Sequence, residues 1–164
     1  MKSDLPKLPT LIVDTREKIA FDYEGDDEFA AVVHRKLDAG DYSIEGIEHL
    51  IVIERKANAD ELYNNFTQNK DRIYAEFERL RSHKVKIIMI EQSCEDICNP
   101  HNYYVNKKGL NKGSINMPVA VVAANLNTLI IEYGVQVIFA GARARSMTKN
   151  ILLAAYKAAR QGKL

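Results

Sequence analysis

The chain has 164 residues, of which 46% are hydrophobic, and its formal net charge is +1. This length and apolar fraction predict a single packed domain over residues 1–164 and exclude an intrinsically disordered chain. No apolar run approaches the roughly 18 residues of a membrane span, and the first residues lack a signal-peptide core. We therefore expect a soluble cytoplasmic protein of prokaryotic or viral type.

Charge is divided unevenly along the chain. Residues 1–60 hold 8 Lys or Arg against 14 Asp or Glu, whereas residues 99–164 hold 9 against 1. An acidic first part suits a cation site, and a basic last part suits the phosphate backbone of a nucleic acid. Folding could also interleave these charges and leave no patch.

Three predicted strands in the first half deliver carboxylates at or just past an end. Apolar, β-branched runs predict strands over 10–15, 31–37 and 50–56, with a short continuation at 42–44. The carboxylates that accompany these strands are Asp14, Glu17, Asp41 and Glu54. A random surface would seldom produce this arrangement.

The third strand carries the most informative residues. Side chains alternate along a strand, so Glu54 and Lys56 point to one face and Arg55 to the other. If Asp41 approaches Glu54, the two carboxylates suit Mg²⁺ or Mn²⁺. Such an ion polarises a phosphate, and Lys56 could orient the attacking water. Taken alone, the same triplet also fits a solvated strand end.

Helical spacing appears in the second half. Asn58 with Glu61 predicts a capped helix start, and apolar spacing continues to Leu80 with a break near 68–70. A strand over 85–91, a helix over 118–134, a strand over 135–139 and a helix over 145–160 follow. This order predicts an α/β fold with a mixed sheet and helices on both faces.

Residues 99–117 form a long polar stretch, which we expect to be a mobile loop. Its lysines could grip phosphates and its tyrosines could stack on bases, although a loop without a role is equally open. These residues are Lys107, Lys108, Lys112, Tyr103 and Tyr104.

Two cysteines, Cys94 and Cys98, precede His101. A zinc site would need a fourth ligand and a more usual spacing, and a disulfide would need an oxidising compartment. We expect ordinary residues after a strand.

Taken in order, three segments resemble the nuclease domain of the XPF-type (ERK-motif) structure-specific endonucleases, a branch of the restriction-endonuclease-like PD-(D/E)xK superfamily. The segments are Asp14-Thr15-Arg16-Glu17, Gly40-Asp41-Tyr42 and Glu54-Arg55-Lys56, the last followed by Asp60. The resemblance covers most of the chain. It implies a restriction-endonuclease-like fold and a metal-dependent endonuclease acting on branched, forked or flapped DNA.

The resemblance also implies roles. Asp41 and Glu54 would be metal ligands, helped by Asp14 and the Arg55 carbonyl, and Lys56 would be the catalytic lysine. Three residues would support the site: Arg16, Glu17 and Asp60. The expected DNA contacts are Arg16, Arg55, Arg72, Lys107, Lys108 and Lys112.

Relatives of this type pair through C-terminal helices, which implies a homodimer through the helices at 118–134 and 145–160. The apolar stripes of those helices could instead fill the monomer core. Many relatives carry helix-hairpin-helix or helicase modules, and this sequence contains neither, which leaves substrate targeting open.

Two other functions stay open. One is another nuclease of the superfamily, such as a junction resolvase, a restriction enzyme or an exonuclease. The other is a non-catalytic DNA-binding scaffold subunit, in which degraded motifs would be expected.

Overall fold

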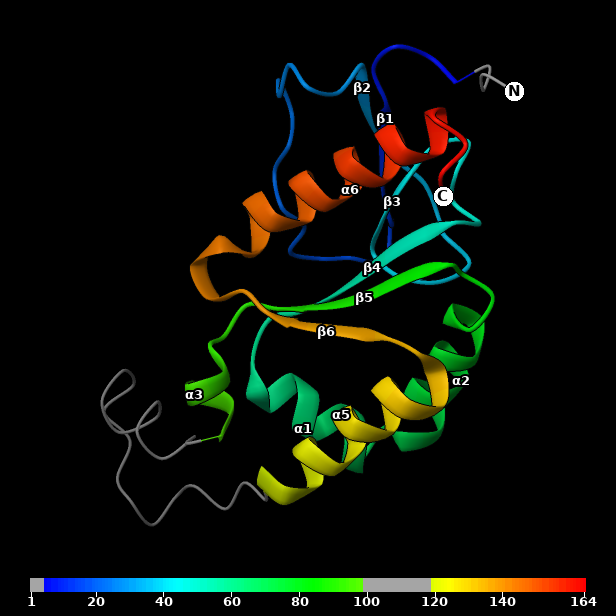
Figure 1. The fold of residues 1–164 in the computed structure, drawn as a ribbon. Helices are drawn as coiled ribbons and strands as arrows, with labels where there is room; N and C mark the ends of the chain where they lie inside the picture. The colour runs from blue at the N-terminus through cyan, green and yellow to red at the C-terminus, as the bar shows by residue number, and fades with distance from the viewer. Residues whose placement is uncertain (1–4, 99–118) are drawn as a thin grey trace.

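A mixed β-sheet runs through the centre of the molecule (Figure 1). The computed structural model describes residues 5–98 and 119–164. Within them the sheet has the strand order β2-β1-β3-β4-β5-β6. The strands are β1 (Thr10–Val13), β2 (Ala31–His34), β3 (Tyr42–Ile44), β4 (Ile51–Lys56), β5 (Val85–Ile90) and β6 (Gln136–Phe139).

Strand direction determines where the strand ends meet. β1 pairs parallel with β2, β3 pairs antiparallel with both β1 and β4, and β4, β5 and β6 run parallel. β1 and β4 therefore point the same way, and the start of β3 lies at the edge where they end.

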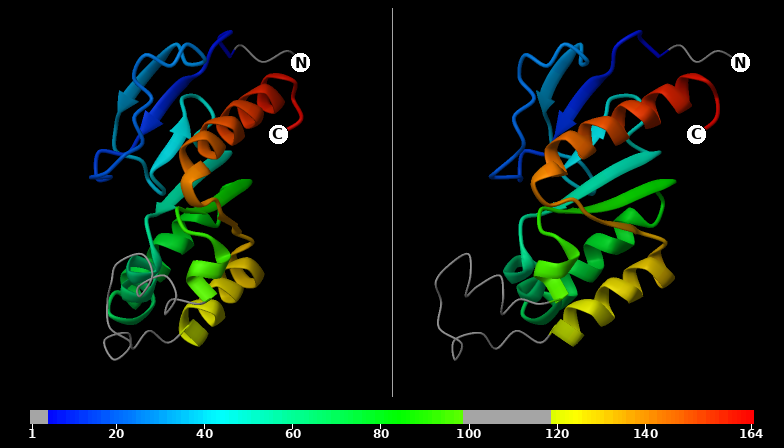
Figure 2. Two further views of the ribbon diagram at one scale, coloured as in Figure 1. Left: turned by 90° about the vertical axis from the view of Figure 1, so that its left-hand side faces the viewer. Right: turned by 60° about the vertical axis from the view of Figure 1, so that its left-hand side comes forward.

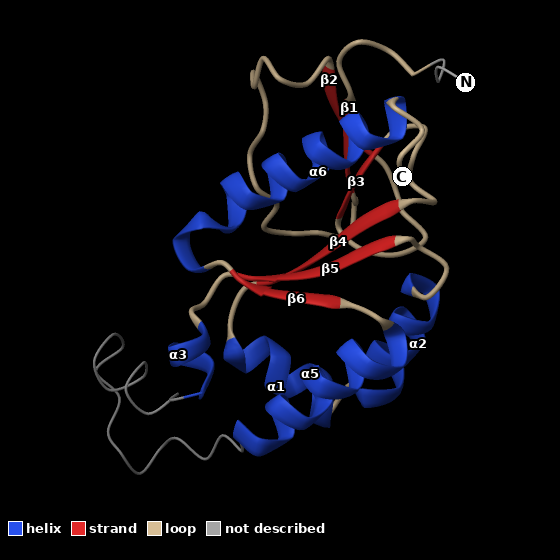
Figure 3. Cartoon of the chain, in the orientation of Figure 1, coloured by secondary structure: helices blue, strands red, loops and turns tan. Residues whose placement is uncertain are grey.

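Helices cover both faces of the sheet (Figures 2 and 3). One face carries α1 (Ala59–Thr67), α2 (Lys70–Leu80), α3 (Cys94–Cys98) and α5 (Val119–Tyr133). The other carries α6 (Ala144–Arg160), which follows the 3₁₀ turn η2 (Gly141–Arg143). The predicted α/β fold is confirmed. Among the described residues, no helix is long and apolar enough to cross a membrane.

Each sheet face has its own hydrophobic core, as two-residue alternation requires. In β4, Ile51 and Ile53 join the core beneath α6, which includes Leu152. Val52 points the opposite way, into the core beneath α1, α2 and α5, which includes Phe77. Glu54 and Lys56 continue the Val52 side of the strand, so they face the α1 and α2 layer.

Some elements differ from the prediction, and the strand expected over 10–15 ends at Val13. The strand expected over 31–37 ends at His34, because the backbone N–H of Leu37 donates to the Asp14 side chain instead of continuing a ladder. A short helix, α3, follows β5 where we expected no helix. The helix start expected at Pro118 lies outside the described residues. Gly134 ends α5 with a φ of +64°, a conformation that suits glycine.

The last helix holds the first part of the chain. The Tyr156 hydroxyl donates to the Pro6 carbonyl at 2.9 Å, and the Tyr23 hydroxyl donates to the Arg145 carbonyl at 2.7 Å. The face of α6 that packs on the sheet includes Leu152, which is fully buried.

Candidate active site

The predicted site residues meet at one edge of the sheet, where β1 and β4 end and β3 begins. Backbone hydrogen bonds fix this meeting: the Asp14 N–H donates to the Asp41 carbonyl at 2.8 Å, and the Asp41 N–H donates to the Ile53 carbonyl at 2.9 Å. Three acidic segments that are distant in sequence thus become neighbours.

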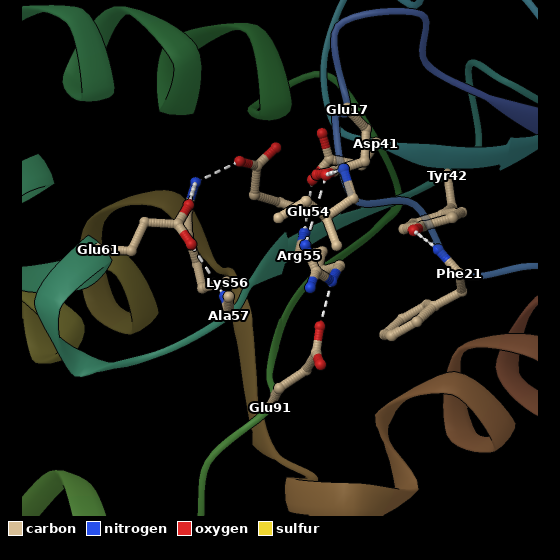
Figure 4. Close-up of polar contacts among 11 residues, drawn as sticks. Glu17, Phe21, Asp41, Tyr42, Glu54, Arg55, Lys56, Ala57, Glu61 and Glu91 are labelled. Carbon is tan, nitrogen blue, oxygen red and sulfur yellow. Dashed lines mark hydrogen bonds and ion pairs between the residues drawn. The ribbon is translucent and has the colours of Figure 1, made fainter. Parts of the chain in front are cut away.

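Glu54 and Lys56 form a buried ion pair in β4 (Figure 4). Lys56 Nζ lies 2.5 Å from Glu54 Oε1 and 3.4 Å from Glu61 Oε1. Burial raises the pKa of Glu54, and the charge of Lys56 only partly opposes this. Burial works against the charged form of Lys56, but the charges of Glu54 and Glu61 outweigh it and raise the pKa of the amine. The amine therefore remains charged.

Asp41 stands beside this pair. Its Oδ2 accepts a hydrogen bond from the Arg55 N–H at 2.7 Å. Burial and then the charge of Glu54 raise the pKa of Asp41 to about 8. Two neighbouring carboxyls that both resist ionisation would be stabilised in their charged form by a cation between them.

Gly40 lets Asp41 approach β4 closely. Its φ is +73°, and a Cβ on it would lie 2.1 Å from Val52 Cγ2 and 3.2 Å from the Ile53 carbonyl oxygen. A larger residue would meet β4 directly, so glycine is required here.

The donors at this edge fit a hard divalent cation. Glu54 Oε2 is buried and has no hydrogen-bond partner in the described part of the chain, which leaves one carboxylate oxygen open to an ion. The N–H and C=O of a strand residue point to the same side, so the Arg55 carbonyl is directed to the side of Asp41. No three His, Cys, Asp or Glu among residues 5–98 and 119–164 gather as a metal-holding group. A small donor set of this kind suits Mg²⁺, which keeps several of its waters.

Arg55 points to the other face, as alternation predicts. Its guanidinium forms an ion pair with Glu91 and another with Glu17 at 3.4 Å, and it lies 5.2 Å from the Phe21 ring centroid. The side chain is only 9% exposed. Arg55 thus ties the segment after β1 to the end of β5, which leaves little surface for a DNA phosphate.

Asp14 is fully occupied by neighbouring donors. Its Oδ1 accepts from the N–H and Nε of Arg16 at 2.7 and 2.8 Å. Its Oδ2 accepts from Arg16 Nη2 at 2.9 Å and from the Leu37 N–H at 2.6 Å. Burial favours the neutral acid, but these hydrogen bonds outweigh it and lower the pKa of Asp14. A carboxylate accepts about four hydrogen bonds, and these four donors use that capacity. Asp14 therefore stabilises the segment that leads to Asp41.

The start of α1 supports Lys56. Asn58 caps the helix by accepting from the Glu61 N–H at 2.9 Å, and Glu61 Oε2 accepts from the Ala57 N–H at 2.9 Å. The predicted cap is confirmed, and it fixes Glu61 beside the amine of Lys56. Asp60 lies half-buried in the first turn of α1.

Glu76 on α2 belongs to this neighbourhood and was not foreseen. Its carboxylate interacts with Glu54 and Lys56, and its charge also acts on Arg16. A sequence signal existed: Glu76 interrupts the apolar i, i+3, i+4, i+7 stripe that includes Ile73 and Leu80.

The remaining predicted residues have varied settings. Arg16 is half exposed but held by Asp14, and Arg72 is exposed on α2. The expected loop 99–117, with Lys107, Lys108 and Lys112, lies outside the described residues. So do Tyr103, Tyr104 and His101.

Cys94 and Cys98 are free and exposed, with 3.7 Å between their sulfur atoms. The expectation of ordinary cysteines stays a prediction, because His101 lies outside the described residues.

The family model for the ERCC4 domain matches residues 13–149. The chain belongs to the ERCC4 domain family. The match includes Asp14, Asp41, Glu54 and Lys56 of this ERCC4 domain. A comparison with curated proteins finds no match.

Solved structures show the same fold. An XPF from Aeropyrum pernix matches with a TM-score of 0.59 and 16% identity over 91% of this chain and 65% of that one. A structure of XPF from Aeropyrum pernix in complex with DNA matches with a TM-score of 0.55 and 17% identity over 91% and 64%. This ERCC4 domain thus spans about 65% of the length of that structure. The family match confirms the predicted resemblance to XPF-type proteins, and the shared fold confirms the predicted α/β architecture.

Proposed function

We propose that this ERCC4 domain is an endonuclease that uses Mg²⁺ or Mn²⁺ to cleave phosphodiester bonds in branched, forked or flapped DNA. The observation that carries the proposal is the pairing of Lys56 Nζ with Glu54 Oε1, while Glu54 Oε2, near Asp41, stays buried without a partner within residues 5–98 and 119–164. Such an open oxygen next to a second carboxylate is what a cation requires.

The residues divide the chemical work. Asp41 and Glu54 would hold the ion, which supplies electrostatic stabilisation of the phosphate and a more acidic water. Lys56 keeps its charge near Glu54, so it can orient a water molecule and offset negative charge that develops on the phosphate. Asp14 holds Arg16 in place, and the backbone N–H of Arg55 holds the Asp41 side chain.

DNA as the substrate rests on two observations. The family match covers the whole site, and the similar XPF from Aeropyrum pernix has a structure in complex with DNA. Exposed Arg72 and the exposed part of Arg16 are the phosphate contacts that this geometry supports. Lys107, Lys108 and Lys112 remain proposed contacts.

A homodimer through α5 is part of the proposal. The apolar residues of α6 fill the monomer core, including Leu152 and Ala155. On α5, however, Ile130 and Ile131 are 48% and 80% exposed. Adjacent exposed isoleucines favour a self-complementary contact with a second copy.

Cleavage of a substrate panel tests the function. End-labelled fork, flap, four-way and linear DNA are incubated with the protein in Mg²⁺, in Mn²⁺ and in EDTA. We expect cutting of branched DNA only with a divalent ion, and a loss on the order of 10²-fold or more for Glu54→Gln and Lys56→Ala. Lys84→Ala changes an exposed lysine before β5 and should cut like the parent.

Each result distinguishes a function. Cutting that persists in EDTA contradicts the metal mechanism, and parent-like cutting by Lys56→Ala contradicts the site. Preference for linear DNA indicates another nuclease of the superfamily. A protein that binds branched DNA and leaves it intact in both ions is a scaffold.

A further inference from the structure

The second oxygen of Glu54 has an unusual setting. The residue is 3% exposed, and while Oε1 accepts from Lys56, Oε2 has no hydrogen-bond partner among the residues that the structure describes. A buried carboxylate oxygen without a donor is costly, and proteins rarely leave one. We therefore expect a hydrogen-bond donor or a cation next to Glu54 Oε2.

Glu76 faces Glu54 from the helix layer. Glu54 lies on the face of β4 that α2 covers, and α2 turns Ile73, Phe77 and Leu80 into the same core as Val52. Glu76 precedes Phe77 on this face and is half-buried, whereas Glu78, two residues further along the helix, is exposed. Burial raises the pKa of Glu54, and the charge of Glu76 raises it further.

Two carboxylates in this position repel each other unless something positive or hydrogen-bonding lies between them. Lys56 forms an ion pair with one oxygen of Glu54, and Arg16 forms an ion pair with Asp14. A hydrogen-bond donor, such as a water molecule bound to a cation, would stabilise the two carboxylates together.

We propose that Glu76 is a positioning residue of the metal site, which accepts a hydrogen bond from a water of the cation held by Asp41 and Glu54. This inference rests on the proposed function. Contact through water agrees with the absence, among the described residues, of a three-residue group that could ligate an ion directly. Mg²⁺ retains waters readily, and carboxylates that bind such waters strengthen metal binding.

Direct measurement of Mn²⁺ binding tests the proposal without DNA. Free Mn²⁺ is followed by electron paramagnetic resonance while the ion is titrated into the parent, Glu76→Gln and Glu78→Gln. We expect Glu76→Gln to bind Mn²⁺ about 10- to 100-fold more weakly. Glu78→Gln, a matched change in an exposed residue of the same helix, should bind like the parent.

The outcomes separate the two proposals. If the parent binds Mn²⁺ and Glu76→Gln binds it equally well, the proposed role of Glu76 is wrong. This conclusion holds even if the variant cleaves DNA more slowly because Lys56 is held less firmly. If the parent binds no Mn²⁺, the proposed metal-dependent function fails, and this inference fails with it.

Urea unfolding in EDTA checks the fold, and Glu76→Gln should be at least as stable as the parent because it removes a carboxylate facing Glu54.

Discussion

We expect Asp41 to destabilise the metal-free domain at neutral and alkaline pH, and Asp41→Asn should show by how much. The pKa of Asp41 is raised from 3.8 to about 8 by burial and by Glu54. At about 1.4 kcal/mol for each pH unit, this difference corresponds to an upper bound of about 6 kcal/mol. The site is only partly buried, and water and local relaxation weaken such effects, so we expect about 2–4 kcal/mol.

The sign follows from proton binding. Between about pH 4 and pH 8 the unfolded chain has lost the Asp41 proton while the folded chain keeps it, so the free energy of unfolding falls as the pH rises. Asparagine carries no such proton, yet its side-chain oxygen can still accept from the Arg55 N–H. The stability advantage of Asp41→Asn should therefore grow from near zero at pH 4 to its full value above pH 8.

Urea unfolding in EDTA at pH 5, 7 and 9 measures this advantage, with Asp38→Asn as a control. Asp38 is exposed, so its change should alter the free energy of unfolding by less than about 0.5 kcal/mol at each pH. Adding Mg²⁺ at about 100 times its dissociation constant should stabilise the parent by about 2.7 kcal/mol and Asp41→Asn far less. An advantage that does not grow with pH, or a less stable variant at pH 9, would refute the reasoning.

Two further predictions concern packing and assembly. Gly40→Ala should lower the free energy of unfolding by about 2–4 kcal/mol, because its Cβ meets Val52 at 2.1 Å. Gly25→Ala has a similar φ of +74° but open space, so urea unfolding should show a loss of only about 1–2 kcal/mol; equal losses would contradict the contact with β4. Ile131→Asp should convert a dimer into a monomer in light scattering after size-exclusion chromatography, and a monomeric parent would exclude the dimer.

The positions of the strands along the chain and the central pair were predictable because they depend on local periodicity. An apolar run ending in Glu54-Arg55-Lys56 requires Glu54 and Lys56 to share a face, and the structure places their side chains in contact. The cap at Asn58 was predictable for the same reason, since its partner Glu61 lies three residues away.

What the sequence did not predict depends on tertiary contacts. Arg55 is buried by Glu17 and Glu91, which come from other elements. The strand that begins at Ala31 is short because the Leu37 N–H donates to the Asp14 carboxylate. Glu76 enters the site only when α2 packs on β4, although its place on an apolar helix face was a signal. The five-residue helix α3 is too short for periodicity to identify.

The contacts of α6 with the beginning of the chain determine where this domain can be truncated. The family match ends at residue 149, within the helix, yet Leu152 and Tyr156 beyond that point are buried, and Tyr156 anchors Pro6. A fragment trimmed to residues 13–149 would lose most of β1 and of α6, and it would uncover one side of the sheet. The boundary that sequence similarity recognises is therefore narrower than the unit that can fold.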